Sequence, residues 1–255
     1  MLKPMETVTR KTLLYRSAVE YADFSLNHVV GCSHGCRYPC YAFLMKKRSG
    51  TVKTYEEWCS PRLVSNALDL LEKEIPKYKR SIKYVHLCFA TDPFMYRQQE
   101  VSDLSLRIIR RLNADSIPCT ILTKGLLPPE IADDALMEKN EYGITLVSLS
   151  DRFNKYYEPN AAGCDERLRA LRKLHDRGLR TWVSIEPYPP PALLEQDIGS
   201  LLDKLSFVNR IVFGRLNYNA VASNCREDYC RIAATISGFC EERGIGCHIK
   251  KGTVA

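Results

Sequence analysis

Three cysteines lie close together in the segment GCSHGCRYPCYAF, at Cys32, Cys36 and Cys40. In a helix the first and the last would be about 12 Å apart along the axis, too far to bind one centre. The glycines and the proline of the segment favour a loop instead, because glycine permits positive φ and proline disrupts a helix interior. The sequence therefore predicts a loop in which three thiolates converge on a soft metal centre.

Two occupants suit such a loop. Cysteine thiolates hold iron–sulfur clusters. A zinc ion would need a fourth ligand, which His28 or His34 supplies, although structural zinc normally uses paired Cys-x2-Cys knuckles and no second pair accompanies this one. The third explanation is three unrelated cysteines near a turn, since a free cysteine is ordinarily a core hydrophobe.

The composition narrows the class of protein. With 255 residues, 45% hydrophobic and 26% charged, the chain is not intrinsically disordered and can bury a core. No apolar run approaches the roughly 20 residues of a membrane span, and the N-terminal sequence lacks a signal peptide's apolar stretch. We therefore expect a cytoplasmic protein without a membrane partner, in which eleven cysteines favour metal binding or catalysis over disulfides.

Apolar runs and helical patterns alternate along the chain. The runs indicate strands buried on both faces, at 25–32, 84–91, 118–125, 143–150, 181–187 and 210–217. Helical spacing of apolar residues occurs between or after them, at 61–75, 101–112, 164–178 and 227–244. About six alternations predict an α/β fold, a right-handed βα-wound barrel or open sheet. We expect a single domain over 1–255, with a core at about 25–217 and a C-terminal helix and strand at 227–252.

Each predicted strand ends in polar residues. Side chains at the C-terminal ends of barrel strands converge on one mouth. The residues at these positions are Cys32, Thr91, Asp92, Lys124, Ser148, Ser150, Glu186, Arg215 and Asn217. Such residues also serve as strand terminators and helix caps, a serious alternative for Asp92 before Pro93. The sequence thus predicts one polar site at the same mouth of the barrel as the cysteine loop.

The segment GCSHGCRYPCYA, with ATDPF at 90–94, LTKG at 122–125 and the EP and RL pairs within 158–168, resembles the radical S-adenosylmethionine (SAM) superfamily. Within it the chain is similar to the spore photoproduct lyase-like branch, over about residues 25–217. The resemblance implies an enzyme with a partial (β/α)6 TIM-like barrel of the radical SAM type.

The resemblance also implies the cofactors. In that superfamily three cysteines bind three irons of a 4Fe-4S cluster, and the fourth iron is left for the amino and carboxylate groups of SAM. Reductive cleavage of SAM then gives a 5′-deoxyadenosyl radical that abstracts hydrogen from a substrate. Cys32, Cys36 and Cys40 would be the ligands. Their Cys-x3-Cys-x3-Cys spacing exceeds the usual one by a residue at Pro39, which a flexible loop absorbs.

By the same resemblance, Lys124 matches the lysine that pairs with the SAM carboxylate, and Ser148 matches a serine that contacts SAM. The other candidate cofactor-binding residues are Tyr38, Tyr41, Thr91, Asp92 and Glu186. Glu158 and Arg167 match the EP and RL pairs, and we interpret them as a charge pair with exposed ends that clamps a loop.

The likeness to the lyase has a limit. Where the lyase has its hydrogen-donor cysteine, this chain has Phe89, and the nearest thiol is Cys88. A one-residue step along a strand turns a side chain to the opposite face. We therefore expect Cys88 to point away from the substrate and the chain not to reverse thymine dimers.

The resemblance implies a flavodoxin- or ferredoxin-like electron donor and leaves the substrate open among a small molecule, a peptide, a nucleic acid and a partner radical SAM protein. A net charge of +7 is compatible with a nucleic-acid substrate, which the enzyme would repair or modify as the lyase does. Candidate phosphate contacts are Lys46, Lys47, Arg48, Lys250 and Lys251. The alternative from another class is a non-catalytic, zinc-stapled nucleic-acid-binding protein that uses the same three cysteines.

Overall fold

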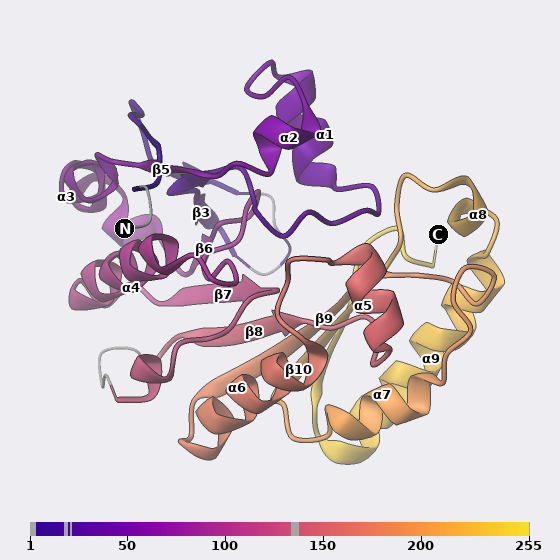
Figure 1. Cartoon of the computed structure of the whole chain (residues 1–255). Coiled ribbons are helices and arrows are strands. Elements are labelled where there is room, and N and C mark those ends of the chain that lie inside the picture. The colour runs from indigo at the N-terminus through magenta and orange to yellow at the C-terminus, as the bar shows by residue number, and fades with distance from the viewer. Residues whose placement is uncertain (1–3, 18–19, 21, 134–137, 255) are drawn as a thin grey trace.

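A computed structural model describes residues 4–17, 20, 22–133 and 138–254 (Figure 1). Its main sheet has the strand order β11-β10-β9-β8-β7-β6-β3-β2, in which β2 (Leu14–Arg16) is antiparallel to its neighbour. The other pairs are parallel. These parallel strands are β3 (Phe24–Leu26), β6 (Val85–Leu87), β7 (Cys119–Thr123), β8 (Glu141–Thr145), β9 (Arg180–Tyr188), β10 (Arg210–Arg215) and β11 (Gly246–Ile249). Among the described residues the two edge strands β2 and β11 do not pair with each other, so the barrel is open and therefore partial, as predicted.

The parallel strands are apolar because both of their faces are covered. One residue from each of five strands is 0% exposed: Leu87, Ile121, Ile144, Val183 and Ile211. Burying each such side chain contributes about 1.5–3 kcal/mol. The larger helices cover the outer face (Figure 1): α3 (Ala67–Tyr78), α4 (Gln99–Ala114), α6 (Cys164–Asp176), α7 (Ile198–Lys204) and α9 (Arg226–Arg243).

The prediction of a helix over 61–75 is wrong at its N-terminal end. Arg62–Val64 forms strand β5, which pairs with β1 (Thr7–Val8) and with β4 (Val29–Val30) in a second, three-stranded sheet. The helix begins only at Ala67. The apolar residues at 63–64 are therefore buried by partners distant in sequence, which local helical spacing does not reveal. The run at 25–32 likewise divides into β3 and β4.

The connection from β4 to β5 contains the cysteine loop and two helices, α1 (Tyr41–Arg48) and α2 (Tyr55–Trp58). Short elements complete the described chain: η1 (Lys79–Ser81), η2 (Pro129–Asp133), α5 (Asp151–Tyr157) and α8 (Ala220–Ser223). None of the helices in the described ranges has the length and apolar character needed to cross a membrane.

Candidate cofactor site

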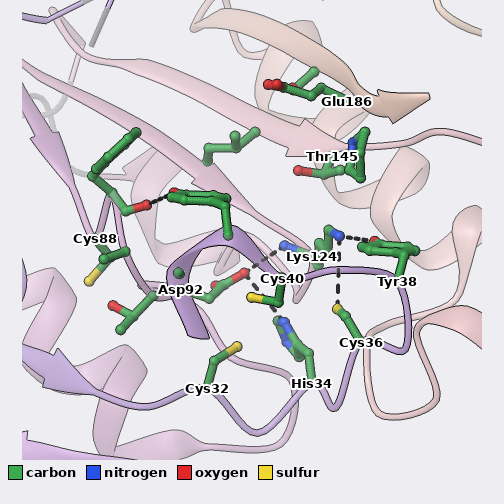
Figure 2. Close-up of a pocket in the computed structure, with 18 of the residues that line it drawn as sticks. Cys32, His34, Cys36, Tyr38, Cys40, Cys88, Asp92, Lys124, Thr145 and Glu186 are labelled. Atoms are coloured by element: carbon green, nitrogen blue, oxygen red, sulfur yellow. Dashed lines mark hydrogen bonds and ion pairs between the residues drawn. The ribbon is translucent and has the colours of Figure 1, made fainter. Parts of the chain in front are cut away.

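A cavity of about 330 Å³ lies where the C-terminal ends of the parallel strands meet the cysteine loop (Figure 2). All three cysteines line it. The other residues that the site's chemistry uses come from separate elements: Tyr38 from the loop, Asp92 from the segment after β6, Lys124 from the end of β7, Thr145 from β8 and Glu186 from β9. The topology thus assembles one site from residues more than 150 positions apart in the chain.

The cysteine loop follows β4 through a turn that only glycine fits. Gly31 has a φ of +94°, and a Cβ there would lie 2.6 Å from the carbonyl oxygen of Trp58. The same carbonyl accepts a hydrogen bond of 2.8 Å from the amide of Cys32, which fixes the first cysteine. Cys40 ends the loop as the residue before α1.

The three sulfur atoms point toward the same space (Figure 2). All eleven cysteines of the chain are free. Within the part of the chain that the structure describes, no three or more histidine, cysteine, aspartate and glutamate side chains are close enough together to bind a single metal ion. A cluster makes a different demand, because each of its cysteines binds a separate iron.

A buried charged group lies beside the loop. Lys124 Nζ is 3.0 Å from Glu158 Oε1, and Arg167 Nη2 is 2.6 Å from Glu158 Oε2. Tyr38 joins them, since its hydroxyl donates to Glu158 and accepts from Lys124. The pairing of Glu158 with Arg167 matches the prediction, but the expected exposed ends are wrong: both side chains are 1% exposed. The buried guanidinium of Arg167 also donates a hydrogen bond to the Thr145 carbonyl at 2.6 Å, so this second nitrogen has a partner inside the protein.

This group carries one excess positive charge. Although burial opposes ionisation, Lys124 and Arg167 hold the pKa of Glu158 well below its usual range. Burial also opposes the charge on Lys124, but Cys36 and Glu158 raise the pKa of its ammonium. Lys124 Nζ, one of the two cations that share this carboxylate, lies 3.9 Å from Cys36 Sγ.

The thiols of Cys32 and Cys36 are neutral in the metal-free chain. Burial raises the pKa of Cys36 to about 11 and also raises the pKa of Cys32, so both remain protonated without a metal. A bound metal deprotonates a coordinating thiol outright. Three soft donors around one cavity, next to the ammonium of Lys124, fit a cysteine-ligated iron–sulfur cluster.

Asp92 holds the site together. Its Oδ1 accepts from Thr123 Oγ1 at 2.6 Å and from the Phe94 amide at 2.9 Å, and its Oδ2 accepts from the Lys124 amide at 2.8 Å. His34 Nδ1 lies 3.5 Å from the same Oδ2. The carboxylate therefore joins the ends of two strands to the cysteine loop. Its role in cofactor binding stays a prediction.

Both histidines considered as a fourth zinc ligand are otherwise engaged. His34 Nε2 accepts from the Tyr96 amide at 3.1 Å, while its Nδ1 faces Asp92. His28 contacts Ser105 Oγ at 2.7 Å through Nε2 and Cys88 Sγ at 3.4 Å through Nδ1. Neither ring has a nitrogen free for a metal in this arrangement.

The hydrogen bonds of His28 define the state of Cys88. Because the Ser105 hydroxyl donates to the Pro93 carbonyl, it accepts from His28 Nε2, and Nδ1 accepts the thiol hydrogen of Cys88. Burial raises the pKa of Cys88 to about 12. Cys88 lies beyond the end of β6 with a φ of +57°, so the alternation argument does not apply to it. It borders the cavity, but its sulfur points away from Lys124 (Figure 2). Absence of thymine-dimer reversal stays a prediction.

The remaining predicted residues divide into two groups. Tyr38, Tyr41, Thr91 and Glu186 line the cavity, and the Tyr41 hydroxyl donates to the Phe89 carbonyl. Ser148 is not among the described residues that line it. That side chain is buried beyond the end of β8, where its Oγ accepts from the Ser150 amide at 3.1 Å. Its predicted contact with SAM is untested.

The cavity also has polar lining residues that were not predicted as part of the cofactor site, among them His86, Thr145, Ser184 and Lys250, the last of which was predicted only as a candidate phosphate contact. Lys250 Nζ forms an ion pair with Glu186 Oε2 at 2.8 Å. A Cβ on Gly214 would lie 2.8 Å from the same carboxyl group, so glycine there leaves room for the pair. Lys250 follows β11, so applying the strand-end rule to the C-terminal strand would have found it.

We expect stability to fall as the pH drops from about 6.5 toward 3. Burial lowers the pKa of His28 and of His86 from 6.5 to about 3, so in this range the unfolded chain binds protons that the folded chain excludes. Urea unfolding at several pH values measures this slope. His86→Gln, which lacks one of the two groups, should flatten it, and an unchanged slope would contradict the burial of a neutral imidazole.

The fold and the site define a class of protein. A partial barrel of parallel βα units, with a three-cysteine loop between its first two parallel strands β3 and β6, is the arrangement expected of radical SAM enzymes. The family model of the radical SAM superfamily matches residues 26–205. The chain belongs to this superfamily and is an enzyme of the radical SAM type.

Individual relatives agree. Spore photoproduct lyase complexed with dinucleoside spore photoproduct superimposes with a TM-score of 0.66 at 16% identity, over 95% of this chain and 80% of the lyase. SuiB of Streptococcus suis bound to S-adenosylmethionine gives 0.50 at 12% identity, over 70% and 42%. At these identities the likeness shows the fold alone.

Two uncharacterized proteins are similar in sequence. One from Methanocaldococcus jannaschii is 26% identical over 204 residues, covering 78% of this chain and 72% of that protein. One from Acidianus two-tailed virus is 23% identical over 188 residues, covering 71% of this chain. The match spans only 61% of the viral protein's length.

Proposed function

We propose that this chain binds a 4Fe-4S cluster through Cys32, Cys36 and Cys40 and cleaves SAM reductively. The observation that supports the proposal best is the convergence of three half-buried thiols on one cavity that Lys124 also lines. When bound, the cluster supplies one electron to SAM and so generates a 5′-deoxyadenosyl radical that abstracts hydrogen from a substrate.

The chain's own residues bind and orient SAM. The ammonium of Lys124 provides a fixed positive charge for the carboxylate of SAM, and Glu158 and Tyr38 hold that ammonium in place. Thr145 and Glu186 line the part of the cavity that the next strands form, where hydroxyl and carboxylate groups suit the ribose of SAM. Asp92 positions the backbone of Lys124. Preorganised groups of this kind position the reactants before the reaction.

Anaerobic purification and reconstitution test the proposal. The protein should be brown, contain acid-labile sulfide, bleach with dithionite and form 5′-deoxyadenosine from SAM. A colourless protein whose folding depends on zinc would instead support the alternative of a zinc-stapled nucleic-acid-binding protein. Pooled candidate substrates, with oligonucleotides first because the similar lyase structure holds a dinucleoside, would then identify the hydrogen donor.

Lys124→Met should weaken SAM binding by about 10- to 100-fold, because a hydrogen bond to a charged group is worth about 1.5–3 kcal/mol. Equilibrium dialysis of SAM against the reconstituted variant measures this. Iron content should be unchanged, since Lys124 supplies no ligand to iron. The exposed Lys79→Met is the matched control and should bind SAM normally. Unaltered affinity in Lys124→Met would remove Lys124 from the SAM site.

A further inference from the structure

Helix α1 exposes a surface that the proposed reaction does not use. Leu44 and Met45 are 40% and 43% exposed, which is high for large apolar side chains on a short helix. Lys47, Arg48 and Lys53 are exposed next to them. We call these five residues the α1 patch. Exposed apolar side chains beside charged ones are typical of protein interaction sites.

The patch is strongly basic. Residues 37–53 contain five lysines and arginines and no aspartate or glutamate. Among the ion pairs of the described residues, none involves Lys47, Arg48 or Lys53. Lys47 lies over the ring of Phe43, 5.8 Å from its centroid, so its contact is with an aromatic face and not with a carboxylate. An acidic partner would therefore complement the charge of this surface.

The position of the patch indicates what the partner does. Cys40 immediately precedes α1, and its carbonyl accepts the Leu44 amide at 3.0 Å. At 1.5 Å per residue, every residue of α1 lies within about 12 Å of Cys40 along the helix axis. Helices α1 and α2 stand at the edge of the molecule, on the side opposite α6 and α7 (Figure 1). A protein bound here would lie beside a cluster ligand without entering through the barrel strands.

We propose that the α1 patch is the docking surface for an acidic electron-transfer protein that reduces the cluster. The inference rests on the proposed function, since it assumes that Cys40 is a cluster ligand. One electron leaves the donor protein, which is oxidised, and enters the cluster, which is reduced. The cations of the patch steer the acidic donor, and Leu44 and Met45 form the apolar centre of the contact.

The apolar centre distinguishes this partner from a nucleic acid. Phosphate contacts are made by lysines, arginines and polar groups and gain nothing from Leu44 and Met45. A protein donor uses both features, because interface centres are depleted of charge while their rims are polar. The two partners thus predict different effects of changing the apolar residues alone.

The test compares two charge-reversal variants. Lys47→Glu/Arg48→Glu alters the patch, and Arg169→Glu/Lys173→Glu makes the same change on the exposed face of α6. Binding of oxidised flavodoxin, and separately of a ferredoxin, to the cluster-free protein is measured at low salt. The patch variant should bind the donor at least about tenfold more weakly, since steering by opposite charges changes association rates by 10- to 1,000-fold. The α6 variant should bind normally.

Kinetics give the second measurement. In the second assay the reconstituted enzyme receives electrons from flavodoxin, which NADPH and a flavodoxin reductase keep reduced. SAM cleavage should then be at least about tenfold slower in the patch variant than in the wild type, because electrostatic steering of the donor is lost. Dithionite, which needs no docking, should support equal rates in both variants and in the wild type. Leu44→Ser/Met45→Ser should weaken donor binding also in high salt, where steering is screened.

The outcomes distinguish a failure of the docking surface from a failure of the proposed function. If dithionite gives no SAM cleavage in the wild type, the proposed function fails, while the binding assay still decides whether the patch docks a protein. If the patch and α6 variants bind both donors equally, the docking surface is refuted. Loss of single-stranded DNA binding in Lys47→Glu/Arg48→Glu, with donor binding intact, would assign the patch to nucleic acid instead.

Discussion

Replacing Cys36 with alanine is expected to abolish reductive cleavage of SAM and leave the fold intact. The change removes one of three thiolates, and two ligands do not hold the cluster. The fold should survive because no disulfide is lost and the main hydrophobic core is formed by the strands and their covering helices. Iron and acid-labile sulfide per chain, 5′-deoxyadenosine formed with dithionite, and the midpoint of thermal unfolding measure the three parts of this expectation.

Cys59→Ala provides the matched control. Cys59 is half-buried and follows α2, near Cys40 in space, but it is not among the described residues that line the cavity. Its variant should keep iron, sulfide and activity. Full activity of Cys36→Ala would refute the proposed cluster. A variant that folds only when zinc is supplied would indicate a structural metal site instead.

Local sequence patterns predicted the elements that depend on local sequence. The strands β6, β7, β8, β9 and β10 are apolar because both of their faces are buried, the outer face under helices and the inner face in the barrel interior, and this appears directly as apolar runs. Helix α9 ends at Gly244, which adopts a φ of +64°, so its C-terminal glycine could be recognised as a cap. For residues 62–64 the local pattern predicted a helix, and this was wrong because pairing with β1 and β4 makes them a strand.

The predicted site had a similar limit. Lys124 and Glu186, which the strand-end rule selected, line the cavity, because the apolar runs of β7 and β9 place the ends of these strands within a few residues. On β8 it selected Ser148, because the apolar run continues three residues past Thr145, where the strand ends. The contact of Tyr38 with Glu158 joins residues 120 positions apart, and only the folded chain brings them together.

Glu158→Gln is expected to destabilise the protein by about 3–5 kcal/mol, the range for removing one member of a buried ion pair. The change leaves the guanidinium of Arg167 and the ammonium of Lys124 buried without their carboxylate. Urea unfolding of the cluster-free protein near neutral pH measures the loss. Glu242→Gln, whose side chain is 76% exposed beside Arg243, should change stability by less than about 0.5 kcal/mol.

Acid should have the same effect as the substitution. Because the pKa of Glu158 is lower in the folded chain than its ordinary value of 4.5, its contribution is fully present above about pH 4.5 and is lost as the pH falls toward the folded value. The stability difference between wild type and Glu158→Gln should therefore shrink in acid. A second substitution separates charge from packing: Glu158→Gln/Arg167→Met removes the unpaired guanidinium and should be less destabilised than the two single variants together. If the stability losses of the two single variants simply add in the double variant, Arg167 stabilises the site through its hydrogen bonds to backbone carbonyls. Glu158 would then not be the group that stabilises the buried guanidinium of Arg167.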